Sequence, residues 1–102
     1  GDILQEQEII HEKKVLEKFF NTLGKQREKA AYGDEEVETA LSRGAVEILY
    51  LSKKLAKPKI KELSRKAGEA SSSIELISND TEEGEQFLNL GGVGALLRFA
   101  LS

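Results

Sequence analysis

The single histidine is the first residue of this sequence that could do chemistry, as a general acid or base. That role requires a nucleophile or a carboxylate held beside the imidazole in a pocket, and no neighbouring motif supplies one. On a helix over the first 23 residues, His11 projects away from the apolar stripe. We therefore predict a solvated surface histidine.

An acidic run is the second candidate, because carboxylates bind hard cations. Asp34, Glu35, Glu36 and Glu38 stand almost side by side in the sequence. A cation requires carboxylates that converge in three dimensions, whereas acidic residues at a helix start are stabilised by the electropositive first turn. We predict helix capping and solvation here, and no metal or other cofactor.

Glycines at 91, 92 and 94 have only a superficial likeness to a phosphate-binding loop. They follow a predicted helix and precede a predicted strand, and phosphate loops have the opposite order. A tight bend or close backbone packing is the expected role. The serines at 71 to 73 are interpreted as a turn, because no base adjoins them to activate a hydroxyl.

Cationic side chains gather in one segment, which contains Lys53, Lys54, Lys57, Lys59, Lys61, Arg65 and Lys66. Two interpretations stay open for it: a solvated loop and helix face, or a contact with RNA or an acidic partner. The net charge of −3 argues against a dedicated nucleic-acid binder, whose affinity depends on cations that neutralise phosphates.

The composition indicates one globular domain over residues 1–102, with 39% hydrophobic and 32% charged residues. The lack of cysteine removes disulfides and cysteine-bound zinc, and it fits a reducing cytoplasm. No apolar run reaches the ~20 residues that cross a bilayer, and no signal-peptide pattern is present. We expect a cytoplasmic protein that does not bind membranes.

A long helix opens the chain, from Ile3 to Leu23. Its apolar stripe should face the core, and it consists of Ile9, Leu16, Phe19, Phe20 and Leu23. Ile3 and Ile10 lie on a different line of this helix and suggest a second apolar contact. Strands are expected near 29–33, 45–51, 74–78 and 95–101, and helices near 34–41, 60–67 and after 79–81. This alternation predicts an α/β sheet with helices on both faces.

Three blocks of sequence resemble one protein family. The first is Ile9-Ile10-His11-Glu12-Lys13-Lys14-Val15-Leu16 with the Phe19-Phe20 pair. The second runs from Ala31-Tyr32-Gly33 through Ala40-Leu41 to Gly44-Ala45-Val46-Glu47-Ile48-Leu49. The third consists of Ile74-Glu75-Leu76-Ile77 and the run from Glu83 to Phe99. In this order they are similar to the C-terminal domain of the class-1 peptide chain release factors, with the archaeal type matching best.

The resemblance implies a three-layer α/β/α sandwich with a mixed four-stranded sheet, similar to the kink-turn-binding ribosomal proteins. It also implies that the chain is part of a longer factor, whose codon-reading domain and Gly-Gly-Gln domain lie upstream. Such a domain has no hydrolase activity of its own. It docks an elongation-factor-like translational GTPase, works on the ribosome in translation termination, and is also where a recycling ATPase docks.

The family's GTPase-binding patch corresponds here to Gly94, Ala95, Leu96, Leu97, Arg98 and Phe99. Strand alternation favours Leu96 and Arg98 as the outward side chains, and the exposed line of Ile3 and Ile10 is expected to extend the patch. Contact of Ile3 and Ile10 with the missing middle domain is an equal alternative.

Two alternatives remain, a rescue factor that shares this domain and an RNA-binding protein of similar fold. The ribosome-rescue factor Pelota shares this domain and, like this chain between Lys53 and Lys59, lacks the minidomain of most release factors. The kink-turn RNA-binding proteins resemble a pattern with an asparagine and a lysine where this chain has Glu35 and Thr39. Direct nucleic-acid binding by this domain is therefore not expected.

Overall fold

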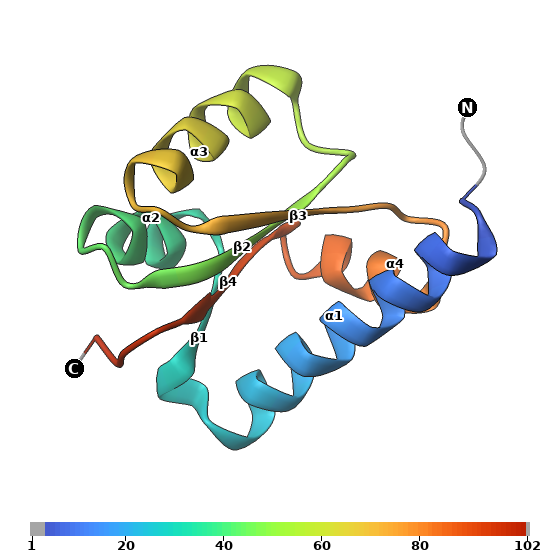
Figure 1. Ribbon diagram of the computed structural model, residues 1–102, viewed down its shortest axis with the longest axis horizontal. Coiled ribbons are helices and arrows are strands. Elements are labelled where there is room, and N and C mark those ends of the chain that lie inside the picture. Colours follow the sequence, from blue (N-terminus) through green and yellow to red (C-terminus); the bar gives the residue numbers. More distant parts are fainter. Residues whose placement is uncertain (1–3, 102) are drawn as a thin grey trace.

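Four helices and four short strands alternate along residues 4–101, the part of the chain that the computed structural model describes (Figure 1). The helices are α1 (Glu6–Lys25), α2 (Asp34–Ser42), α3 (Lys57–Glu69) and α4 (Glu82–Asn89). The strands are β1 (Ala30–Tyr32), β2 (Val46–Ser52), β3 (Ser73–Ile77) and β4 (Val93–Leu97), and a 3-10 turn, Arg27–Lys29, precedes β1. None of the helices in this described part is long and apolar enough to cross a membrane.

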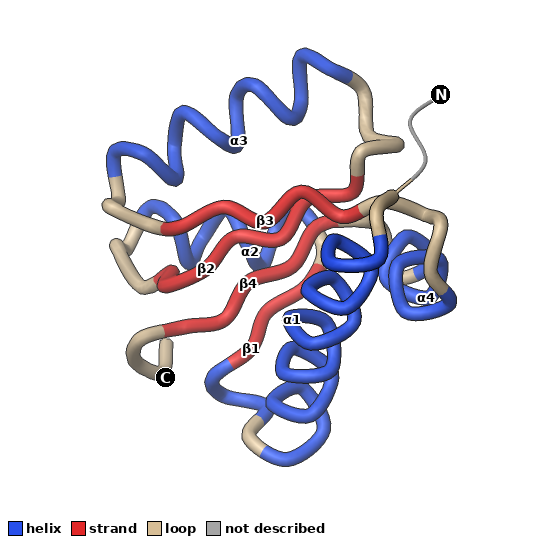
Figure 2. The backbone as a smooth tube through the Cα atoms, turned by 45° about the vertical axis from the view of Figure 1, so that its right-hand side comes forward, coloured by secondary structure: helices blue, strands red, loops and turns tan. Residues whose placement is uncertain are grey.

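The strands form one mixed sheet in the order β1-β4-β2-β3 (Figure 2). β4 runs antiparallel to both of its neighbours, whereas β2 and β3 are parallel to each other. The last strand of the chain therefore lies in the middle of the sheet, and β1 and β3 form its two edges.

Helices cover both faces of the sheet, with α1 and α4 on one side and α2 and α3 on the other (Figure 2). Successive residues of β2 alternate between these layers: Leu49 and Leu51 join the core under α2 and α3, and Tyr50 joins the core under α1 and α4. The predicted three-layer sandwich with a mixed four-stranded sheet is confirmed.

A β-bulge in β2 changes which face its first residues use. Val46 pairs with Leu97 and Ile48 with Leu96, so Glu47 is an extra residue on β2. Val46 consequently packs in the α2–α3 core, while Ile48 packs against the α1–α4 core. Regular alternation would have put both side chains on the same face.

Several helix ends differ from the sequence-based expectation. The structure starts α1 at Glu6, where the Gln5 N–H donates to Glu8 Oε1 at 3.0 Å, and continues it past Gly24. Gly33, at φ 88°, is the N-cap of α2, and Asp34 is its first helical residue rather than its cap. Ile3 lies outside the described residues.

The third helix and the last strand also begin earlier than predicted. α3 starts at Lys57 because Pro58 fits the first turn, where its missing N–H leaves no helical bond unmade. β4 begins at Val93 and ends at Leu97, since its pairing with β1 and β2 ends at Leu96 and Leu97. Arg98 and Phe99 therefore lie beyond the strand.

Candidate docking surface

The predicted tail patch is mostly inside the molecule. Gly94, Ala95, Leu96 and Leu97 are all buried, because β4 is a central strand with helices over both faces. The expectation that Leu96 points to solvent is wrong: its side chain is 5% exposed and lies in the α1–α4 core. Only Arg98 and Phe99 of this segment are exposed.

Gly94 has a packing role. A Cβ at this position would lie 2.8 Å from Cζ of Phe19 and 2.9 Å from Cε1 of Phe87. These two rings meet edge to face, with their centroids 5.6 Å apart, directly over β4. Gly91 and Gly92 form the bend before the strand, with φ of 113° and 74°. The glycine-rich tail thus brings the backbone close to an aromatic cluster, and the predicted tight bend is confirmed.

Arg98 points outward, as predicted, but its guanidinium is held by backbone carbonyls. Nη2 donates to the carbonyl oxygens of Val46 at 2.6 Å, Ser71 at 3.1 Å and Ala70 at 3.4 Å. Ala70 is the C-cap of α3 and Ser71 follows it, at a helix end where a cation is favoured by the helix dipole. Arg98 therefore ties the end of β4 to the C-terminus of α3, and any partner contact would have to share this side chain.

Phe99 and Ile10 are the clearly exposed apolar side chains of the predicted patch, at 47% and 52% exposure. Ile10 lies near the start of α1, whereas Phe99 follows β4 near the C-terminus, and these parts lie at opposite ends of the long axis (Figure 1). The structure does not bring the two side chains together into one continuous surface.

A buried carboxylate is the polar feature that the sequence analysis missed. Glu12, on α1, is 5% exposed, and its side chain accepts hydrogen bonds from the Ser78 N–H and hydroxyl, both at 2.8 Å, and from the Thr81 hydroxyl at 2.7 Å. Thr81 caps α4 by accepting from the Gly84 N–H. The signal was present: Glu12 stands four residues before Leu16, on the same apolar stripe of the helix.

Gly84 leaves room for this carboxylate. A Cβ there would collide with the Ser78 carbonyl oxygen and would stand 3.0 Å from Glu12 Oε2. The network joins α1 to the start of α4, and its donors and acceptor satisfy one another, so its role is to hold the two helices together.

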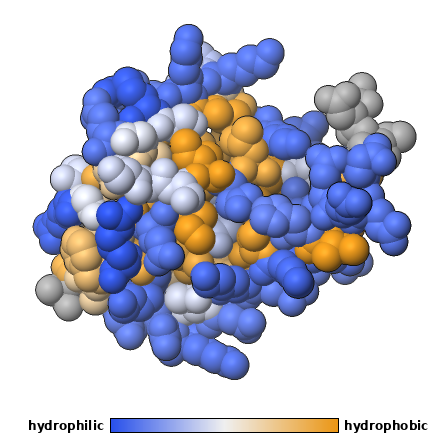
Figure 3. Space-filling model, in the orientation of Figure 1, coloured by the Kyte–Doolittle hydropathy of each residue, from blue (hydrophilic) through white to orange (hydrophobic). Residues whose placement is uncertain are grey.

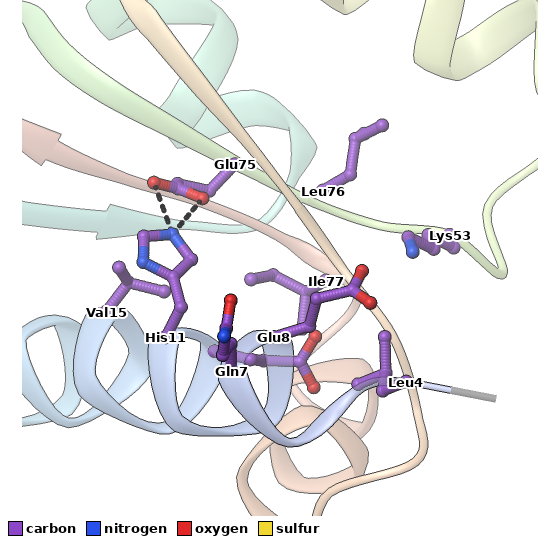
Figure 4. A pocket seen from close by; sticks show the side chains of 10 residues that line it. Leu4, Gln7, Glu8, His11, Val15, Lys53, Glu75, Leu76 and Ile77 are labelled. Carbon is purple, nitrogen blue, oxygen red and sulfur yellow. Dashed lines mark hydrogen bonds and ion pairs between the residues drawn. The ribbon is translucent and has the colours of Figure 1, made fainter.

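A shallow groove of about 230 Å³ lies between α1 and β3 (Figure 4). His11 Nε2 lies 3.0 Å from Glu75 Oε1 across the groove, and the His11 side chain is 61% exposed. The surface position predicted for His11 is therefore confirmed. Within residues 4–101, no three His, Cys, Asp or Glu side chains are grouped so that they could hold a metal ion.

The basic segment is only partly neutralised. Lys59 pairs with Asp34, Lys66 pairs with Glu38, and Arg65 lies between two glutamates of its own helix. The acidic run at the start of α2 is thus used in ion pairs and in the first helical turn. Four lysines have no ion-pair partner in the described part of the chain: Lys53, Lys54, Lys57 and Lys61.

These features define a mixed-sheet α/β sandwich whose glycines, buried carboxylate and arginine serve packing. Residues 9–101 match the family described as eRF1 domain 3. The chain belongs to this family, as the resemblance of its three sequence blocks predicted.

Relatives in the family include both peptide chain release factors and pelota homologs. The chain is 34% identical to peptide chain release factor subunit 1 of Methanobrevibacter smithii over 144 residues, covering 97% of this chain and 35% of that protein. It is 37% identical to the protein pelota homolog of Pyrococcus horikoshii over 103 residues, covering 97% of this chain and 29% of that protein. The chain thus spans about a third of the length of these relatives.

Solved structures show the same architecture. The C-terminal domain of the release factor from Methanosarcina mazei matches with a TM-score of 0.86 at 24% identity, over 94% of this chain and 86% of that one. S. cerevisiae Dom34, described as interacting with Hbs1, matches with a TM-score of 0.84 at 26% identity, over 96% of this chain and 29% of that one. Archaeal Pelota, from a ribosome-bound assembly with ABCE1, matches with a TM-score of 0.78 at 31% identity, over 92% of this chain and 27% of that one.

Proposed function

We propose that this chain is the protein-docking domain of an archaeal translation termination factor, and that it binds an elongation-factor-like GTPase. The observation that carries the proposal is the family match over residues 9–101, which includes Arg98 and Phe99, just after β4. The description of Dom34 as interacting with Hbs1 supports a role in binding a protein partner.

The proposed contact is centred on Phe99, with Arg98 beside it. An exposed aromatic side chain next to an arginine is the composition typical of a binding hot spot. Gly94 to Leu97 contribute by building the central strand that positions these two residues. Ile10 lies at the other end of the molecule, so we assign it to a separate contact, either with an upstream domain of the full factor or with the ribosome.

The domain acts by binding and performs no bond breaking of its own. Its glycines and its buried Glu12 have the structural explanations given above. The acid–base pair His11–Glu75 lines a groove in which, among the described residues, no serine, threonine or cysteine stands beside it as a nucleophile. A role in kink-turn RNA binding is also not proposed, because the start of α2 presents Asp34, Glu35 and Glu36 where a phosphate would approach.

Ribosome rescue is a second candidate function, favoured by the length of the alignments. The release-factor alignment runs over 144 positions, more than the 102 residues of this chain, whereas the pelota alignment runs over 103. This chain therefore lacks inserted residues that the release factor carries, and in this respect it is like Pelota. A Gly-Gly-Gln motif encoded upstream would establish termination, and its absence would establish rescue.

Ribosome association and docking of a recycling ATPase belong to the same proposal. Archaeal Pelota, which shares this fold at 31% identity, occurs in an assembly with the ribosome and ABCE1. A matching contact by this chain would place both partners on the same domain as the GTPase.

The proposal is tested by titrating the chain with its GTP-loaded GTPase partner in a calorimeter. Phe99→Asp is expected to weaken binding at least about tenfold, because it removes an apolar anchor and adds a charge. Asn21→Asp adds the same charge at an exposed position of α1 and is the matched control. Equal affinities for the two variants would remove Phe99 from the contact.

A further inference from the structure

Strand β3 is an exposed sheet edge that carries two apolar side chains. Ile74 is 38% and Leu76 is 48% exposed, and β3 has only one neighbour, β2. Hydrophobic surface gathers over β3 and along the side of α3 that faces it (Figure 3). In the close-up, Leu76 points away from α1, whereas Glu75 points toward His11 (Figure 4).

The backbone groups of these same two residues face outward. The Ile77 carbonyl accepts from the Lys53 N–H at the end of β2, so the polar groups of Ile77 and of every second residue before it point toward β2. The backbone groups of the residues in between, Ile74 and Leu76, must therefore point away from the sheet. Ser78 continues this outward series, and its N–H donates to Glu12. The N–H and C=O groups of Ile74 and Leu76 are left facing out.

The opposite edge of the sheet is protected, which makes β3 unusual. β1 has three residues, and Arg27 Nη1 covers its edge by donating to the Ala30 carbonyl at 2.6 Å. β3 has five residues and contains none of the lysines or prolines that commonly block a sheet edge. An open strand with exposed isoleucine and leucine is the type of edge to which an extended peptide adds.

Unpaired cations lie at one end of this edge. Lys53 and Lys54 follow β2, which runs parallel to β3, so they lie at the C-terminal end of both strands. Lys53 lines the same groove as Leu76. Lys57 and Lys61, one helical turn apart at the start of α3, add two exposed positive charges. These side chains complement an acidic ligand.

We propose that β3 binds an extended, acidic segment of a partner protein, which adds to the sheet as a fifth strand. Its backbone would pair with Ile74 and Leu76, its apolar side chains would cover theirs, and its carboxylates would meet the four lysines. This site is separate from the Phe99 contact and does not depend on the GTPase proposal.

A second copy of the chain fits this edge less well. Antiparallel pairing of two β3 strands that sets Ile74 opposite Leu76 also sets Glu75 opposite Glu75. Like charges directly opposite each other destabilise a strand pair, and each Glu75 is already paired with His11.

The test uses a fluorescein-labelled peptide of about ten residues, long enough to span a strand of ordinary length. Valine alternates with threonine along it, so that no carboxylate lies opposite Glu75, and three aspartates at one end are placed to reach the lysines. Fluorescence anisotropy with the 102-residue chain should give a Kd in the range of about 1–100 μM. A peptide with lysine in place of aspartate is the charge control and should bind at least about tenfold more weakly.

Two variants of one residue separate the backbone contact from the side-chain contact. Ile74→Ala removes most of the side chain and keeps the N–H, whereas Ile74→Pro also removes the N–H, which is not used by β2. We expect Ile74→Pro to bind the peptide at least about tenfold more weakly than Ile74→Ala. Because the hydrogen bonds between β3 and β2 stay intact, the melting temperature of Ile74→Pro should stay within a few degrees of that of Ile74→Ala.

A double variant keeps the proposal testable if the proline variant does not fold. Lys53→Glu with Lys54→Glu reverses charge at exposed positions and should abolish binding of the aspartate peptide. The proposal is overturned if no binding is seen up to about 1 mM, if the lysine peptide binds equally well, or if the double variant binds like the unaltered chain. It is also overturned if the chain is a dimer that Ile74→Pro dissociates, because β3 would then be occupied by a second copy.

Discussion

Glu12 shows how a charged residue that no sequence motif singles out can be a structural part of the core. A carboxylate on the apolar face of a helix is costly to bury unless hydrogen bonds satisfy it. Its three donors come from Ser78 and Thr81, more than sixty positions along the chain. Periodicity places Glu12 on the buried stripe of α1, but it says nothing of partners so distant, so its role could be read only from the fold.

Removing the Glu12 carboxylate should destabilise the domain strongly. Glu12→Ala leaves the Ser78 and Thr81 donors buried without an acceptor, and we expect a loss of about 2–3 kcal/mol in the free energy of unfolding. Urea unfolding followed by circular dichroism measures this loss. Glu17→Ala, at an exposed position of the same helix, should change stability by less than about 0.5 kcal/mol. Equal effects of the two changes would contradict the assigned network.

Tyr50 provides a prediction about pH. Its buried hydroxyl donates to the Val15 carbonyl at 3.1 Å, and burial, followed by the charges of Glu75 and Glu47, raises the pKa of Tyr50 above its ordinary value. The protonated form is thus favoured in the folded state. The protonated hydroxyl therefore contributes to the free energy of unfolding. This contribution is complete below the unfolded pKa of about 10, and it is lost as the pH rises above that value toward the raised pKa of the folded state.

Replacing Tyr50 isolates this contribution. Tyr50→Phe should lower the free energy of unfolding at neutral pH by about 1 kcal/mol, because the Val15 carbonyl loses its donor. Above pH 10, the difference in the free energy of unfolding between Tyr50→Phe and the unaltered chain should shrink as the pH rises. Urea unfolding at several pH values measures this difference. Tyr32→Phe, on an exposed ring, is the control. A difference that is constant across this pH range would show that the Tyr50 hydroxyl does not titrate with unfolding.

The type of each helix and strand could be predicted from local sequence patterns, but the residues at which the elements end depend on contacts between elements. The stripe of α1 and the apolar run of β2 were predictable because period and burial go together. The bulge at Glu47 was not, because it exists only relative to β4. The inward direction of Leu96 was missed for the same reason: alternation identifies two faces, but only the sheet order shows that both are covered.

The C-terminal end of α3 is a place where one substitution should increase the stability of the domain. Ser71 has φ 57° at the position after the helix, with the Ser72 N–H bonded to the Ala67 carbonyl and the Ser71 N–H to the Gly68 carbonyl. This is a Schellman ending, in which glycine is preferred because a Cβ is strained at positive φ. Ser71→Gly should raise the free energy of unfolding by about 0.5–1 kcal/mol.

Thermal or urea unfolding measures the effect of Ser71→Gly. Ser73→Gly is the matched control, because Ser73 lies in β3 and glycine should weaken a strand. A stabilisation by Ser73→Gly, or a loss on Ser71→Gly, would show that the backbone at Ser71 is not strained.

The whole molecule is a sandwich with one hydrophobic core on each face of the sheet, and its exposed apolar features lie apart from one another. Phe99, just after β4, and Ile10 on α1 lie at opposite ends of a domain with extents of 38 × 31 × 21 Å, and the open edge of β3 is a third exposed feature. A small domain with several separate contact surfaces is suited to binding more than one partner. This fits the proposed place of the domain among a GTPase, the ribosome and a recycling ATPase.

The central claim is that the domain works by holding another protein, and one titration tests it most directly. The 102-residue chain is added to the elongation-factor-like GTPase of its own organism, loaded with a non-hydrolysable GTP analogue, in a calorimeter. We expect saturable one-to-one binding with a Kd of about 10 μM or tighter. An absence of binding at concentrations up to about 1 mM would contradict the account.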